Sequence, residues 1–105
     1  MLRAVSICPD ADLSVRLEEI CGRVGRVGLV KSIDHYITGY ELERFLRANA
    51  PNVVFLSFES VNQALEVAAS VEQIMPGLQV VAIDKTCDPS ALLDIMRAGI
   101  REFLF

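Results

Sequence analysis

The stretch PNVVFLS, residues 51–57, carries the strongest signal for the fold. Pro and Asn are typical of a turn, and the apolar residues that follow are rich in β-branched and aromatic types, which predicts a short strand at residues 53–56. These apolar residues follow one another without polar alternation. We therefore expect the strand to be buried on both faces, which is typical of a central strand in a parallel sheet covered by helices.

Two strand and helix pairs precede this stretch. Strands are predicted at residues 3–8 and 27–33, and the second is more polar, as expected at the edge of a sheet. One helix is predicted after Pro9 and is expected to end before Gly22, and another is predicted after Gly39. Apolar residues at helical spacing indicate the inward faces, namely Leu13, Leu17 and Ile20 in the first helix, and Leu42, Phe45 and Leu46 in the second.

One helix and one strand follow the stretch directly. Ser60 and Gln63 form the pattern of a capping box at the start of a helix, and Pro76 with Gly77 ends that helix. The next strand is predicted at residues 78–83. The residues expected to face inward along this helix are Val61, Leu65, Ala68 and Val71.

A last helix and strand complete a regular alternation. Asp88 and Pro89 supply a cap and a first helical residue, Gly99 ends that helix, and a strand is predicted at residues 102–105. Five strands that alternate with four helices predict a doubly wound α/β fold, with a five-stranded parallel sheet in the order 2-1-3-4-5 and right-handed crossovers.

The helix expected after the last strand, which would share one face of the sheet with the first helix, is missing at residue 105. Leaving the apolar side chains of that face in water would cost on the order of several kcal/mol. We therefore expect a second copy of the chain, as in a homodimer, or a following segment of the intact protein to cover this face.

The composition limits the possible functions. The chain has 105 residues, with 10 Lys and Arg against 14 Asp and Glu, so its net charge is -4. We interpret residues 1–105 as one domain, and its negative charge argues against binding to nucleic acid. No apolar run approaches the roughly 20 residues of a membrane span, so a cytoplasmic protein without membrane insertion is expected. Cys8, Cys21 and Cys87 lack the spacing of metal ligands and are expected to be reduced thiols.

Two stretches make the chain resemble a response-regulator receiver domain of the CheY-like (flavodoxin-like) type over essentially its whole length. Residues 51–57 resemble the strand that ends in a phosphoacceptor aspartate, and MRAGIREFL at residues 96–104 resembles the turn into the last strand. In its Arg-Ala-Gly-x-Arg-Glu-Phe-Leu form, the second stretch resembles the atypical receiver module at the N-terminus of CpaE/TadZ-type pilus-assembly proteins. The resemblance implies a module that precedes a ParA/MinD-like ATPase domain and helps to position Flp (Tad) pili at the cell pole. Nothing in the chain resembles the glycine-rich phosphate loop of such an ATPase.

The resemblance also locates a pocket. In an active receiver, two carboxylates after the first strand and one at the end of the third strand hold Mg²⁺, and the last of them accepts the phosphoryl group. These positions fall on Cys8, Pro9 and Ser57. A thiol is too soft for Mg²⁺, proline offers no ligand, and a serine hydroxyl cannot form an acyl phosphate and has no evident base beside it. We expect a degenerate pocket with no metal, no cofactor and no catalysis, and we interpret Cys8 as a buried, inert thiol rather than a reactive one.

Two further positions of the receiver pattern agree with this expectation. The hydroxyl residue expected near the end of the fourth strand aligns with Ile83, and the lysine expected after the last strand would fall beyond residue 105. Phe103 occupies the position of the aromatic switch residue, and we interpret it as a core or interface ring.

Some polar residues remain at the same edge of the predicted sheet. Asp10, Asp12, Glu59 and Asp84 follow the carboxyl ends of strands, where a weak metal site is one interpretation. A helix cap at Asp10 or Asp12, with solvated carboxylates elsewhere, is the preferred one. His35 is interpreted as a solvated turn residue rather than a pH sensor.

The last predicted helix offers a candidate surface for partners. Leu93 and Arg97 are expected to point outward, beside Arg101 in the turn that follows. One interpretation is a protein interface, to which Phe105 would contribute; the other is a solvated helix with one stray apolar residue.

Three functional interpretations follow, in order of preference. The first is a phosphorylation-independent pseudo-receiver, a non-enzymatic module that binds protein partners and regulates or localises pilus assembly. The second is a two-component receiver with a rearranged Mg²⁺-dependent pocket, in which Asp10 and Asp84 bind the metal. The third is a sensor of a small ligand, ranked last because no glycine-rich turn or basic cluster marks a binding cradle.

Overall fold

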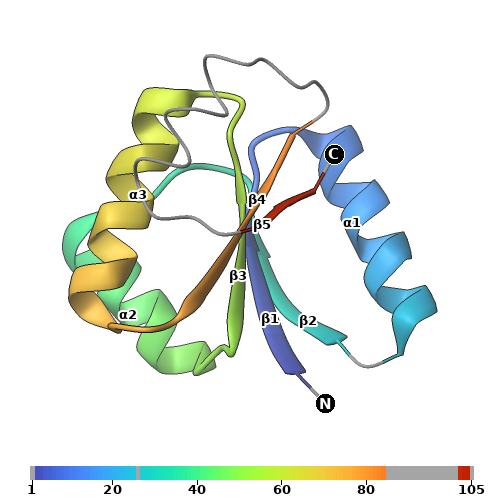
Figure 1. Ribbon diagram of the computed structural model, residues 1–105, viewed down its shortest axis with the longest axis horizontal. Helices are drawn as coiled ribbons and strands as arrows, with labels where there is room; N and C mark the ends of the chain where they lie inside the picture. Colours follow the sequence, from blue (N-terminus) through green and yellow to red (C-terminus); the bar gives the residue numbers. More distant parts are fainter. Residues whose placement is uncertain (1, 26, 85–101, 105) are drawn as a thin grey trace.

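The structure is a computed structural model and describes residues 2–25, 27–84 and 102–104 (Figure 1). The helix predicted between Asp88 and Gly99 lies outside these residues, as do Cys87 and the candidate interface residues Leu93, Arg97, Arg101 and Phe105. The described elements are, in chain order, β1 (Leu2–Ile7), α1 (Ala11–Val24), β2 (Val27–Ile33), α2 (Gly39–Asn49), β3 (Val53–Ser57), α3 (Val61–Ile74), β4 (Gln79–Ile83) and β5 (Glu102–Leu104).

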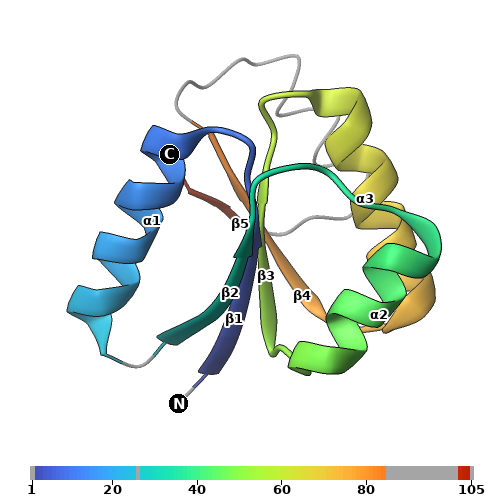
Figure 2. The same cartoon turned by 180° about the vertical axis from the view of Figure 1, so that it is seen from behind.

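The strands form one parallel sheet in the order β2-β1-β3-β4-β5. Helix α1 covers one face of the sheet, and α2 and α3 lie side by side on the other face (Figures 1 and 2). This is the predicted α/β doubly wound arrangement, and the strand bounds differ from the predicted ones by a residue at some ends. In the described part of the chain, no helix is both long enough and apolar enough to cross a membrane.

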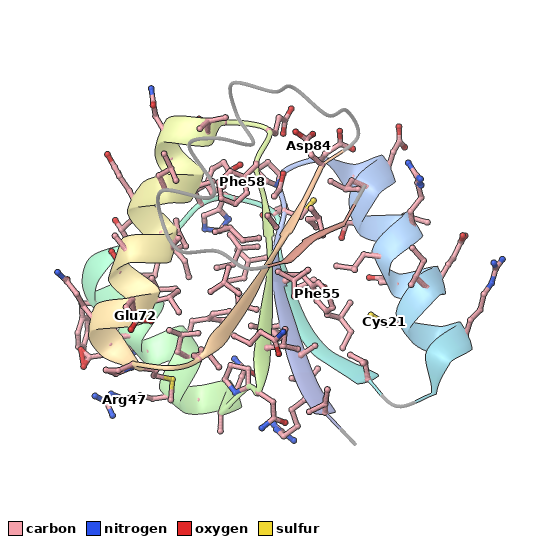
Figure 3. All side chains as sticks on the ribbon, in the orientation of Figure 1. Cys21, Arg47, Phe55, Phe58, Glu72 and Asp84 are labelled. Atoms are coloured by element: carbon pink, nitrogen blue, oxygen red, sulfur yellow. The ribbon has the colours of Figure 1, made fainter. Side chains whose placement is uncertain are left out.

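Strand β3 is central and largely buried on both faces, as its unbroken apolar run predicts, although Phe55 is only half-buried. Val54 and Leu56 are fully buried on the side of α2 and α3, where they pack in the largest apolar cluster of the described residues. Phe55 points to the other side, toward α1, and Phe58, just after the strand, points toward α3 (Figure 3). The residues that α2 and α3 bury most deeply are Leu42, Leu46, Ala64, Val67, Ala68 and Val71.

A bulge in the edge strand β2 sets which of its residues face each side. Leu29 pairs with Ala4, but the next pair joins Lys31 to Val5, so Val30 is an extra residue in the ladder. In a strand without a bulge, Leu29 and Ile33, which are four residues apart, would face the same side of the sheet. With it, Leu29 packs on the side of α1 and Ile33 packs into the cluster under α2 and α3.

Helix α1 is longer than predicted. It passes through Gly22 and ends at Val24, because Gly25 adopts the left-handed conformation (φ 72°) that stops a helix and its N–H bonds to the carbonyl of Cys21. The prediction that Ile20 faces inward is wrong. Ile20 is 40% exposed, and Cys21, four residues after Leu17, is the buried residue.

The start of α3 also differs from the prediction. Ser60 is the N-cap residue, but its side chain makes no capping hydrogen bond, so the predicted capping box with Gln63 does not form. The deeply buried face is rotated toward the small residue Ala64 and toward Val67, whereas Leu65 is only half-buried, because α3 packs closely against both β3 and α2.

We predict that the packing of α1 contributes directly to stability. Leu17 lies on the inner face of α1 and is 2% exposed. Replacing it by Ala should lower the free energy of unfolding by about 2–5 kcal/mol because a cavity forms in the core. Urea unfolding followed by circular dichroism measures the change. Val15→Ala on the same helix, where Val15 is 53% exposed, is the control and should change stability by only about 0.5 kcal/mol. Equal effects of the two substitutions would contradict the placement of α1.

Candidate functional site

The carboxyl ends of β1, β3 and β4 meet at one edge of the sheet, and the predicted pocket residues lie there. The backbone N–H of Cys8 donates to the carbonyl of Ile33 (2.9 Å), and the N–H of Phe58 donates to the carbonyl of Ile83 (3.0 Å). These bonds extend the sheet ladder beyond the strands. They hold the loops after β1 and β3 close to the sheet, and Asp84 begins the chain that leaves β4 at the same edge (Figure 3).

Cys8 is buried, with 2% of its surface exposed. Its Sγ donates to the backbone carbonyl of Asp10 (3.3 Å). Burial raises the pKa of the Cys8 thiol above its ordinary value, and the charges of Asp10 and Glu59 raise it further, although hydrogen bonds to the Asp10 backbone and the Ser57 side chain oppose the shift. The thiol is therefore protonated at neutral pH, which makes it a poor nucleophile and a poor metal ligand.

Asp10 caps α1. Its Oδ1 accepts the N–H of Leu13 (3.0 Å), and its carbonyl accepts the N–H of Ser14 (3.0 Å). The cap satisfies one of the free N–H groups at the helix start. The preferred interpretation of this carboxylate as a helix cap is confirmed for Asp10.

At the end of β3, the side chain and the carbonyl of Ser57 are both hydrogen-bonded within the protein. Ser57 is fully buried, and its Oγ accepts the N–H of Glu59 (3.2 Å). Its carbonyl oxygen accepts the hydroxyl of Tyr36 (2.7 Å), and the oxygen of that hydroxyl accepts the N–H of Ser60 (3.2 Å). The loop between β3 and α3 is thus tied to the segment between β2 and α2.

Sequence reasoning missed Tyr36. The residue is half-buried, and burial raises the pKa of its phenol, so the hydroxyl stays protonated and able to donate. Its partners lie 21 and 24 residues further along the chain. No local pattern signals such a contact, because it depends on how the loops after two separated strands come together.

At the end of β4 lies an apolar residue, Ile83, which the resemblance to a receiver aligned with a hydroxyl residue. Ile83 is 1% exposed and belongs to the apolar cluster under α1, together with Cys8, Leu13 and Leu17. Phe103 lies in β5, where the register places it opposite Ala82.

The described residues contain no group of three or more His, Cys, Asp or Glu side chains that could hold a metal ion. His35 is 63% exposed, and its Nδ1 lies 3.0 Å from Oδ1 of Asp34, so the interpretation of His35 as a solvated turn residue is confirmed. Cys21 is the second free thiol of the described residues, and burial raises its pKa as well.

No protein-family model and no curated protein sequence matches the chain. Solved structures do match it. The signal receiver domain of the response regulator NarL from Mycobacterium tuberculosis superimposes with a TM-score of 0.77 and 20% identity, over 98% of this chain and 82% of that one. The chain has the fold of a response-regulator receiver domain.

Receiver folds from pilus-assembly proteins are also similar to this chain. A protein described as the pilus assembly protein CpaE from Burkholderia thailandensis matches with a TM-score of 0.73 and 20% identity, over 99% of this chain and 84% of that one. A pilus assembly-related protein from Burkholderia pseudomallei matches with a TM-score of 0.72 and 21% identity, over 99% of this chain and 77% of that one. The predicted likeness to the CpaE-type module is confirmed at the level of the fold.

We predict that the Tyr36 hydroxyl stabilises the loop after β3. Tyr36→Phe removes the donor to Ser57 and the acceptor for Ser60, and should lower the free energy of unfolding by about 1–3 kcal/mol. It should also speed amide hydrogen exchange at Ser60. Tyr40→Phe is the matched control, because Tyr40 is 73% exposed, and it should leave both measurements unchanged. Unaltered exchange at Ser60 in Tyr36→Phe would show that the bridge does not hold the loop.

Cys8 should resist alkylation in the folded protein. Because burial raises its pKa, little thiolate is present at neutral pH, and labelling by iodoacetamide should be slow and should accelerate as pH rises. The stabilising effect of this neutral thiol is complete below the ordinary thiol pKa and is lost as pH rises through the raised value. Peptide mapping of labelled folded and urea-unfolded protein measures the rates. Equal rates in the two states would contradict the buried thiol.

Proposed function

We propose that this receiver fold is a phosphorylation-independent pseudo-receiver, a module that binds protein partners and catalyses no reaction. The observation that carries the proposal is the environment of Ser57. Its hydroxyl is fully buried at the phosphoacceptor position and accepts a hydrogen bond from the loop that follows. A serine in this setting forms no acyl phosphate, and no base among its hydrogen-bond partners activates it.

The neighbouring positions support the same proposal. Where a receiver needs hard oxygen ligands for Mg²⁺, this chain has the protonated thiol of Cys8 and the ring of Pro9. The carboxylate of Asp10 caps α1, and Ile83 replaces the hydroxyl residue with an apolar side chain that packs in the core. The degenerate pocket is thus filled by groups that serve the stability of the fold.

The bridge made by Tyr36 supports a fixed conformation. It joins the loop after β3 to the segment after β2 through the protein's own hydrogen bonds. A phosphoryl group would otherwise be the ligand that orders this edge of the sheet. We propose that the domain presents one conformation to its partners in all phosphorylation conditions.

The proposed setting is pilus assembly. Two of the similar structures are described as pilus-assembly proteins, and the RAGIREFL stretch at residues 97–104 resembles the module of that family. We propose that the module works in the cytoplasm at the cell pole, that it is joined to a ParA/MinD-like ATPase domain in the intact protein, and that it self-associates. Phe103 is proposed as a core or interface ring. The proposed partner surface comprises Leu93, Arg97, Arg101 and Phe105.

Amide NMR spectra recorded during addition of Mg²⁺ and then beryllofluoride, a phosphoryl mimic, test the proposal. We expect no shift of the amides around Asp10, Ser57 and Asp84, because Cys8, Pro9 and Ser57 put no carboxylate where a receiver binds Mg²⁺ and accepts the phosphoryl group. Incubation with acetyl phosphate and Mg²⁺ should leave the intact mass unchanged. Concerted shifts at sub-millimolar metal that spread to Phe103, or a phosphorylated mass, would instead establish a two-component receiver with a rearranged pocket.

A further inference from the structure

One hollow of the described residues adjoins the degenerate pocket and shares Cys8 and Pro9 with it. It is a groove of about 830 Å³ at the carboxyl ends of β1 and β2, and Ser57 is not among its lining residues. The loops after these two neighbouring strands leave in opposite directions, toward α1 on one face and α2 on the other (Figure 2). Neighbouring strands with diverging loops leave a crevice at the end of a sheet, and this one adjoins the β1/β3 switch point at which sheets of this strand order ordinarily bind their ligand.

The segment after β2 that carries Asp34 and His35 is held in the core at both of its ends. The bulge at Val30 turns Ile33 into the cluster under α2 and α3, and Ile37, four residues later, is 5% exposed in the same cluster. Asp34 and His35 lie between these two anchors and line the groove. The bulge therefore determines where these polar side chains are presented.

The lining of the groove is acidic. The described residues that line the groove include Asp34 and Glu41, and none of these described residues is a lysine or arginine. A hydrogen bond from His35 is the main cause of a lowered pKa at Asp34, so this carboxyl group is ionised throughout the neutral range. Such a groove disfavours phosphate and other anions and attracts a cation.

Apolar side chains also line the groove. Val15 on α1, 53% exposed, and the half-buried Phe45 on α2 line opposite sides of the groove. Arginine and lysine join a charged head to an apolar stem, and this combination matches a groove with acidic and apolar lining. The volume exceeds that of one such side chain, so neighbouring residues of a peptide segment fit as well.

We propose that this groove binds an arginine or lysine side chain of a partner protein, together with an apolar residue beside it. The proposal rests on the function of the domain as an interaction module and names the chemistry of one partner. Asp34 and Glu41 bind the charged head, and Val15 and Phe45 contact the stem and the neighbouring apolar residue.

Binding of a capped Leu-Arg-Leu tripeptide, followed by amide NMR, tests the proposal. We expect saturable shifts confined to residues 8–15 and 32–45. The same peptide with citrulline, a neutral isostere of arginine, should give none. Asp34→Asn combined with Glu41→Gln should raise the Kd about fivefold or more, whereas Glu72→Gln on α3, outside the groove, should leave it unchanged.

Three results with the peptides would overturn the proposal. They are equal binding of the arginine and citrulline peptides, shifts located outside the groove, and an unchanged Kd in the double variant whose amide spectrum shows that it is folded. The same titration is made with agmatine, a small molecule that carries a guanidinium group on an alkyl stem. If it binds as tightly as the peptide, the groove is a small-molecule site and the partner assignment fails. The beryllofluoride titration tests the loss of phosphorylation through other amides, so failure of either proposal is recognised separately.

Discussion

The burial of β3 on both faces is the constraint on which the rest of the described structure depends. Val54 and Leu56 face α2 and α3, and Phe55 faces α1, so the strand requires helices on both sides. A strand buried in this way also ends in a dry environment. The polar groups of Ser57 must then find partners inside the protein, because an unpaired buried polar group costs about 1–3 kcal/mol. The amide of Glu59 and the hydroxyl of Tyr36 supply them.

The degenerate pocket follows from the same physical logic. Carboxylates around a metal ion need a polar, solvated edge, but Cys8 and Ile83 extend the apolar cluster under α1 to that edge. A thiol and an aliphatic side chain tolerate burial without a counter-charge, whereas clustered carboxylates do not. Hydrogen bonds from Tyr36 and the cap by Asp10 then order the two loops without a metal ion. The proposed loss of the phosphorylation chemistry is compatible with retention of the fold because different residues carry each of them.

Two chemistries lie along the carboxyl edge of the sheet. The open groove with Asp34 and Glu41 lies at the ends of β1 and β2, and the buried, hydrogen-bonded Ser57 lies at the end of β3. The bulge at Val30 contributes to the groove, since it allows one short strand to send Leu29 and Ile33 to opposite faces. Residues after the strand are thereby presented at a fixed position next to α1 and α2.

The sequence by itself determined the alternation of strands and helices, the central place of residues 53–56, and the presence of a thiol at Cys8 and a hydroxyl at Ser57 where strands end. These depend on local periodicity and on residue type, both of which can be read directly from the sequence. Tertiary structure alone decided the bulge in β2, the inward turn of Cys21 rather than Ile20, and the bridge from Tyr36 to the loop after β3. The bulge depends on strand register, the bridge on loops separated by some twenty residues or more, and the side that Cys21 faces on how α1 packs against the sheet. Such contacts exist only once the sheet has brought those segments together.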